Sequence, residues 1–185
     1  ELINKGRKKI LIGAVPRSGK TYILAGTILK HVMNHYDERH KYLIITPAPT
    51  ETISEYIRVF NENIDFENRS IKAIEVNKDI TKYNNNKLDG NIVYIASKQR
   101  LGYNDKNVPE EKLKEIRKNV EKYFDKQQFD MIFIDEARYG MSTQAAENIL
   151  SILDNQNCPK IFITATYNKP KLRYNIEQKE ILTWN

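Results

Sequence analysis

The sequence predicts an α/β domain in which a mostly parallel sheet lies between two layers of helices, a three-layer sandwich. Short runs such as KYLIIT (41–46) and MIFI (131–134) are apolar on both faces, which is typical of strands buried inside a sheet. Longer amphipathic stretches separate these runs, as expected where helices join parallel strands. The 185 residues are enough for one such domain with a sizeable core.

The pattern of apolar residues places the elements of this fold along the chain. We expect strands at 8–15, 41–46, 70–76, 91–96, 130–137 and 160–166. We expect helices at 20–35, 50–63, 109–124 and 143–153, and an asparagine-rich loop at 83–91. Because no repeat or linker divides the sequence, residues 1–185 are expected to form a single domain.

The composition is that of an ordinary globular protein with a basic excess. Hydrophobic residues make up 40% and charged residues 29%, and the formal net charge is +6 with a pI of about 9.2. A basic excess suits a polyanionic partner such as nucleic acid. A solvated, lysine-rich surface would give the same balance.

The sequence favours an intracellular protein without a membrane partner. No apolar run approaches the ~18 residues of a transmembrane helix, and no signal-peptide pattern opens the chain. The single cysteine, Cys158, cannot form an internal disulfide, which fits a reducing compartment. Because the chain begins at Glu1 and not at Met, we expect it to be a piece of a longer polypeptide.

A phosphate-binding loop is predicted where the first strand meets the first helix. The residues AVPRSGKT (14–21) end like a P-loop, with Ala14 in place of the first glycine. Amides and the dipole at a helix N-terminus attract phosphate. Gly19 would let the backbone approach, Lys20 would reach the β- and γ-phosphates, and the Thr21 hydroxyl would coordinate Mg²⁺. The predicted nucleotide-binding residues are Ala14, Arg17, Ser18, Gly19, Lys20 and Thr21. An ordinary strand–turn–helix with a lysine cap is the alternative.

Two adjacent carboxylates, Asp135 and Glu136, follow the buried run MIFI. At the end of a strand, Asp135 is placed to hold Mg²⁺, and Glu136 can orient and deprotonate an attacking water. Such a pair is also common as a helix cap or surface charge, but together with the loop it predicts ATP hydrolysis. A small-molecule kinase would not need Glu136, since the substrate hydroxyl is its nucleophile.

Polar clusters follow the ends of five expected elements of the sheet. They lie at 19–21, 46–50, 97–100, 135–136 and 164–166. Ligands of parallel α/β sheets bind at the carboxyl ends of the strands. The sequence therefore predicts one continuous functional edge.

With these clusters in this order, the chain resembles the N-terminal, RecA-like domain of superfamily 2 helicases and translocases. AVPRSGKT resembles motif I, TPAPTET (46–52) motif Ia, SKQRLG (97–102) the motif Ib region, DEAR (135–138) motif II and TAT (164–166) motif III. The resemblance implies Mg-ATP as cofactor, with Lys20, Asp135 and Glu136 as catalytic residues and Thr21 and Asp135 as Mg²⁺ ligands.

The resemblance also implies roles in nucleic-acid binding. Thr164 and Thr166 would couple the nucleotide state to nucleic-acid binding. The backbone of the nucleic acid would be contacted by Thr46, Thr50, Ser97 and Arg100, and hydroxyls and arginine are indeed common donors to phosphate oxygens. Capping of a helix by Thr50 and a solvated turn at 97–100 are the alternatives.

Departures from the DEAD-box pattern place the chain outside that group. Motif II carries Arg138 where that group has Asp, and no adenine-reading glutamine precedes the loop. TAT followed by Tyr167 resembles the Thr-Ala-Thr-Pro of restriction-enzyme motors, remodelling translocases and large-DNA-virus helicases. The partner is expected to be nucleic acid, DNA sooner than RNA, and the choice between the two stays open.

The family's second RecA-like domain, with its arginine finger, has no counterpart after Thr166. We therefore expect that domain as a partner from the same parent chain, and weak hydrolysis by the 185 residues alone. Two alternatives remain: a translocase that does not separate strands, and a P-loop module without motor function.

Overall fold

The strands form one sheet in which neighbouring strands are parallel. The computed structural model describes residues 3, 6, 8–15, 17–47, 51–76, 89–98, 109–135, 153–165 and 175–184. In this part of the chain the sheet has seven strands in the order β3-β4-β2-β5-β6-β1-β7. Their bounds are β1 Lys9–Ala14, β2 Lys41–Thr46, β3 Ile71–Glu75, β4 Asn91–Ser97, β5 Met131–Asp135, β6 Lys160–Thr164 and β7 Ile181–Trp184.

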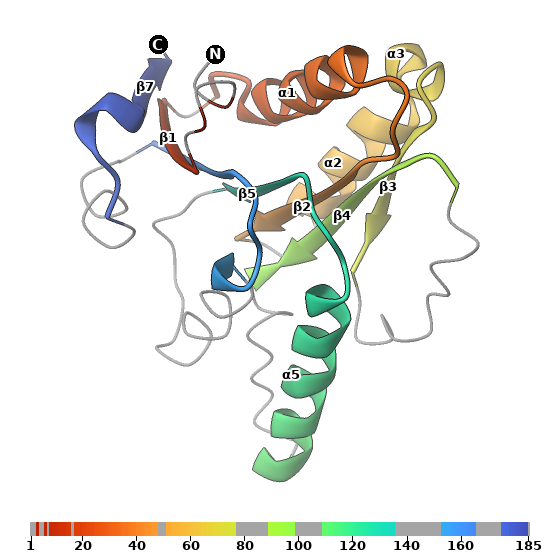
Figure 1. Cartoon of the computed structure of the whole chain (residues 1–185), viewed down its shortest axis with the longest axis vertical. Coiled ribbons are helices and arrows are strands. Elements are labelled where there is room, and N and C mark those ends of the chain that lie inside the picture. Colours follow the sequence, from red (N-terminus) through yellow and green to blue (C-terminus); the bar gives the residue numbers. More distant parts are fainter. Residues whose placement is uncertain are drawn as a thin grey trace.

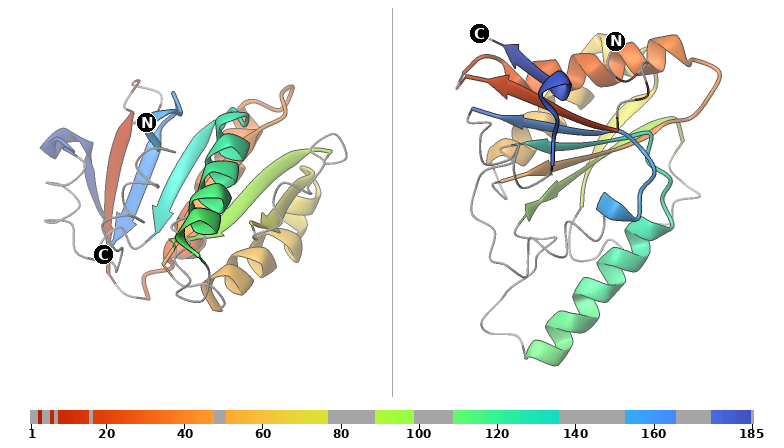
Figure 2. Two further views of the ribbon diagram at one scale, coloured as in Figure 1. Left: turned by 90° about the horizontal axis from the view of Figure 1, so that it is seen from below. Right: turned by 60° about the vertical axis from the view of Figure 1, so that its left-hand side comes forward.

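Helices lie on both sides of this sheet (Figures 1 and 2), although α5 projects away from it in Figure 1. One face carries α1 (Lys20–Asn34), α2 (Glu51–Asn61) and α3 (Ile64–Glu67), whose apolar residues, among them Leu24, Ile28 and Phe60, pack into one core with the sheet. The other face carries α5 (Glu110–Asp125), whose Phe124 belongs to the second core. A short 3₁₀ helix, η3 (Gln178–Glu180), precedes β7. The predicted α/β class with helices on both faces is confirmed.

The local predictions agree with most described elements and differ at two. The helix expected at 50–63 is α2, which ends at Asn61, and an unexpected short helix, α3, follows it, because the Asn63 side chain accepts a hydrogen bond from the Asp65 amide at 2.9 Å and starts α3 as its N-cap. Strand β7 was not expected at all. The expected helix at 143–153 and loop at 83–91 lie almost entirely outside the described residues.

A polar cluster ties the amino ends of β2 and β5 together, at the edge opposite the predicted site. Asp130 accepts hydrogen bonds from the Lys41 amide at 2.8 Å and from Nδ1 of the buried His40 at 3.1 Å. His31 pairs with the Tyr42 hydroxyl at 2.8 Å. Partial burial, and next the nearby His40 and His35, lower the pKa of His31 to about 4, whereas the charge of Asp130 acts to raise it.

The described ranges contain neither a membrane-spanning helix nor a group of metal-binding side chains. No helix in them is both long and apolar enough to cross a bilayer. No group of three or more His, Cys, Asp or Glu residues in them is arranged to hold a metal ion, although the rings of His31, His35 and His40 lie within 6 Å of one another.

Candidate functional site

The predicted phosphate loop connects β1, which ends at Ala14, to α1, which begins at Lys20. A turn closes it, with the Ser18 amide donating to the Val15 carbonyl at 3.2 Å. The backbone then takes the left-handed conformation at Arg17 (φ 63°) and Gly19 (φ 78°). Glycine adopts this region readily, whereas a residue with a Cβ is strained there. The loop therefore stores strain at Arg17, as functional loops often do.

The start of α1 fits a phosphate. Gly19 at the N-cap makes no side-chain cap, and the first turn of α1 carries no acidic residue. Neither the N-cap nor the first turn therefore places a side-chain anion on these amides and on the positive end of the dipole. The buried hydroxyl oxygen of Ser18 has no hydrogen-bond partner among the described residues. An unsatisfied buried hydroxyl costs free energy, and a bound oxyanion would supply the missing hydrogen-bond partner of Ser18.

The strand register brings the other predicted residues to the same edge. Asp135 is the last residue of β5, one strand from β6, where Thr164 pairs with Gly13 at the end of β1. Thr46 and Ser97 face each other across β2 and β4. The structure therefore places the ends of β1, β2, β4, β5 and β6 along one edge, as the sequence predicted.

Burial limits what these strand-end side chains can touch. Thr46, Ser97 and Thr164 have no exposed surface, and Asp135 is 5% exposed. As placed, the hydroxyls of Thr46 and Ser97 do not face solvent, so their contact with a nucleic-acid backbone stays a prediction. Four predicted site residues, Thr50, Arg100, Glu136 and Thr166, lie outside the described residues.

Sequence reasoning missed Tyr56 of α2, which joins two predicted Mg²⁺ ligands. Its hydroxyl donates to Oδ2 of Asp135 at 3.1 Å and is also hydrogen-bonded to Thr21. Burial, and next the nearby Asp135, raise the pKa of Tyr56, so the phenol stays protonated. The apolar stripe of α2, with Ile53, Tyr56 and Phe60 all buried, predicts that this ring is inside but not which groups its hydroxyl meets.

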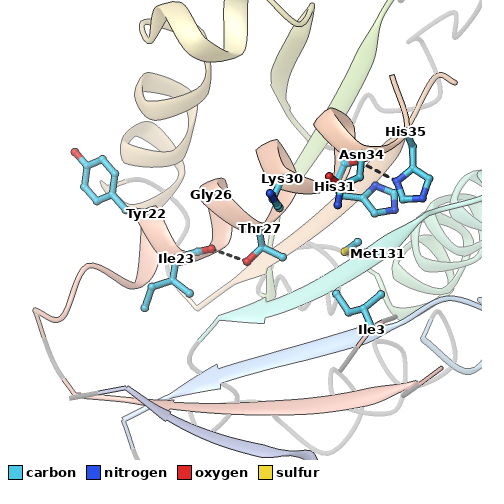
Figure 3. A pocket seen from close by; sticks show the side chains of 10 residues that line it. All are labelled: Ile3, Tyr22, Ile23, Gly26, Thr27, Lys30, His31, Asn34, His35 and Met131. Carbon is cyan, nitrogen blue, oxygen red and sulfur yellow. Dashed lines mark hydrogen bonds between the residues drawn. The ribbon is translucent and has the colours of Figure 1, made fainter. Parts of the chain in front are cut away.

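A groove of about 470 Å³ adjoins the loop and runs along α1 (Figure 3). It begins at Tyr22, the residue after Thr21, and its far end lies at His35. Ile3 and Met131 form part of the opposite wall. A Cβ at Gly26, which also lines the groove, would meet no atom within 4 Å, so the groove is open at that point.

The sequence profile of one protein family, described as "Type III restriction enzyme, res subunit" (ResIII), matches residues 1–169. The chain belongs to the ResIII family. This membership confirms the resemblance to superfamily 2 motor proteins. No curated protein is similar enough in sequence to the ResIII chain to count as a match.

Two solved helicases are similar to the ResIII chain in structure. The UvsW helicase from Bacteriophage T4 aligns with a TM-score of 0.57 at 20% identity, over 96% of this chain and 55% of UvsW. The DUF1998 helicase MrfA, solved bound to DNA and AMPPNP, aligns with a TM-score of 0.65 at 20% identity, over 100% of this chain and 25% of MrfA. At such identity the likeness confirms the fold, and the ResIII chain spans only about half and a quarter of these two proteins.

Proposed function

We propose that this chain is the ATP-binding domain of an ATP-dependent helicase or translocase that acts on nucleic acid. The observation that carries the proposal is the meeting of three elements at one edge. The edge holds the loop before α1, Thr21 on that helix and Asp135 at the end of β5. The buried hydroxyl of Tyr56 joins Thr21 and Asp135. Membership of the ResIII family and the ligands of MrfA, DNA and AMPPNP, support it.

Each residue of the proposed site has a separate role in binding or hydrolysing ATP. Amides at the start of α1 and the Ser18 hydroxyl would donate to phosphate oxygens, and the Lys20 ammonium would bind the β- and γ-phosphates. Thr21 and Asp135 would hold Mg²⁺, which supplies neutralisation of the phosphate charge when bound. Glu136 would orient the attacking water and take its proton. The groove along α1, which starts at Tyr22, is one described space into which the nucleoside part could extend.

Nucleic acid would lie across the same edge of the sheet. Thr46, Thr50, Ser97 and Arg100 would contact its backbone, and Thr164 and Thr166 would relay the nucleotide state. The net charge of +6 suits a polyanion. Because Thr46 and Ser97 are buried, their hydroxyls would have to become exposed to make this contact. DNA is the proposed polymer, because MrfA was solved with DNA and because of the Thr-Ala-Thr-Tyr sequence.

A second RecA-like domain in the parent protein would complete the ATP site. Arginine fingers contribute about 10³–10⁵-fold to the rate in related phosphoryl-transfer systems. The 185-residue chain alone should therefore bind nucleotide but hydrolyse it slowly. Rapid turnover by the chain alone, stimulated by nucleic acid, would contradict this part of the proposal.

The test is nucleic-acid-stimulated ATP hydrolysis by this chain together with the proposed second RecA-like domain. Glu136→Gln should abolish stimulated hydrolysis while nucleotide binding persists, and Lys20→Ala should weaken binding itself. Unchanged hydrolysis in Glu136→Gln would refute the catalytic assignment. Nucleotide binding without any stimulation by single- or double-stranded DNA or RNA, compared over a salt series, would indicate a module without motor function.

A further inference from the structure

The hydroxyl of Tyr56 lies between side chains from two other elements, Thr21 of α1 and Asp135 of β5. It donates to Oδ2 of Asp135 at 3.1 Å and is hydrogen-bonded to the Thr21 hydroxyl. The side chain of Tyr56 has no exposed surface. A fully buried phenol thus bridges two groups that the proposed function assigns to Mg²⁺.

Proton counting fixes the direction of this chain of hydrogen bonds. A phenol carries one proton, and that proton is donated to the carboxylate of Asp135. The Thr21 hydroxyl must therefore be the donor in its bond to Tyr56. With its proton turned toward Tyr56, Thr21 presents its oxygen lone pairs on the other side, where a cation needs them. The same bond holds one carboxylate oxygen of Asp135 in place.

The ring of Tyr56 is itself held firmly. It packs in the core formed by α1, α2, α3 and the sheet, together with the buried Ile53 and Phe60 of its own helix. Side chains in such a core occupy fixed positions because interiors are close-packed. The hydroxyl is thus a fixed point between α1 and β5.

We propose that Tyr56 is a positioning residue that orients Thr21 and Asp135 for Mg²⁺ and thereby sets the Mg²⁺ requirement of nucleotide binding. This inference rests on the proposed function, since it needs a nucleotide in the loop. Tyr56 touches neither phosphate nor the reacting atoms in this role and acts through its two partners.

The experiment measures binding of a fluorescent ADP analogue to the 185-residue chain over a series of Mg²⁺ concentrations. Tyr56→Phe keeps the ring and removes the hydroxyl. It should raise the Mg²⁺ concentration for half-maximal binding about tenfold, the size expected for one hydrogen bond to a charged group. Affinity in the presence of EDTA should stay unchanged, which separates a metal effect from damage to the loop. An unchanged or lower Mg²⁺ requirement would overturn the proposal.

Tyr42→Phe is the matched control. Tyr42 is also fully buried, and within the described part of the chain its hydroxyl bonds to His31, near the opposite edge of the sheet. It should lose similar stability without changing the Mg²⁺ requirement. An equal rise in both variants would mean that the effect is general loosening of the core, and the proposal would fall.

A double-mutant cycle adds a readout that a purely structural role would not move. In an Asp135→Asn chain, Tyr56→Phe should cause no further change in Mg²⁺ requirement, because the partner it orients is already altered. Additive effects would count against the proposal. If the wild-type chain binds no nucleotide at any Mg²⁺ concentration, the proposed function itself has failed. If the wild-type chain binds nucleotide and Tyr56→Phe has the same Mg²⁺ requirement, only the role of Tyr56 has failed.

Should Tyr56→Phe not fold, as judged by circular dichroism, the wild-type chain can be labelled with fluorotyrosine. Mn²⁺ added with nucleotide in place of Mg²⁺ should broaden the ¹⁹F resonance of at least one solvent-protected tyrosine. Tyr42 lies farther from the site, so its resonance, identified in the Tyr42→Phe chain, should broaden less. No broadening of any protected tyrosine would place the cation away from Tyr56 and overturn the inference.

Discussion

Two glycines of the loop and helix, Gly19 and Gly26, should respond to alanine in opposite directions. Gly19 has φ 78°, in the left-handed region, whereas Gly26 lies inside α1. A Cβ at either position would meet no atom within 4 Å, so steric clash plays no part in the comparison. Gly19→Ala should lose about 1–2 kcal/mol, because alanine is strained in left-handed backbone. Gly26→Ala should gain about 0.5–1 kcal/mol from better helix propensity and reduced freedom of the unfolded chain.

Urea unfolding followed by circular dichroism measures both changes. The two variants should differ by about 1.5–3 kcal/mol in the free energy of unfolding, with similar m-values if both unfold in two states. Nucleotide binding should weaken in Gly19→Ala, since relief of the strain would move the amides at the start of α1. If Gly19→Ala is as stable as the wild type and binds nucleotide equally, the left-handed conformation does not constrain this loop and the reasoning is refuted.

Three further variants test other parts of the structure. Because burial lowers the pKa of His31 from its ordinary 6.5 to about 4, the unfolded chain takes up a proton first as pH falls. The free energy of unfolding should therefore decline between pH 7 and 4, by at most about 1–2 kcal/mol for this half-buried ring. The urea midpoint, measured against pH, should fall less steeply in His31→Gln than in the wild type. An equally steep fall in both would contradict this prediction. Arg17→Gly should be neutral or stabilise by up to about 1 kcal/mol in the same urea assay, since it relieves a φ of 63°, and a clear loss would show that the side chain supports the loop. Gly90→Ala should cost about 3 kcal/mol or more, because its Cβ would lie 2.4 Å from the Ser70 carbonyl oxygen at a φ of 91°; a melting temperature equal to the wild type would disprove the contact.

The sequence was most informative where one local pattern determines the outcome. Strand β2 has the predicted bounds, because KYLIIT is buried on both faces and Pro47 follows it. The phosphate loop was predicted from its Gly-Lys-Thr ending between a strand and a helix. The meeting of this loop with Asp135 followed from a general rule, since parallel strands bring their carboxyl ends to one edge.

What the sequence left out depends on contacts between distant residues. Tyr56 could be predicted to be buried, but its pairing with Asp135 across 79 positions has no local signature. Burial of Thr46 and Ser97 depends on what packs around them in the folded chain, not on the residues themselves. Strand β7 is four residues long and pairs only with β1 in the described sheet, so no apolar pattern on both faces indicated it.

Strand β7 has a practical consequence for anyone who shortens this chain. The family profile ends at residue 169, yet β7 (Ile181–Trp184) pairs in parallel with β1, from Leu11 to Ala14. A recombinant version cut at the profile boundary would leave the strand that leads into the phosphate loop with an open row of amides and carbonyls. Open strand edges recruit other chains, so such a version should form soluble aggregates or inclusion bodies during expression. A version that retains β7 should keep this edge covered and elute as a single species on size-exclusion chromatography.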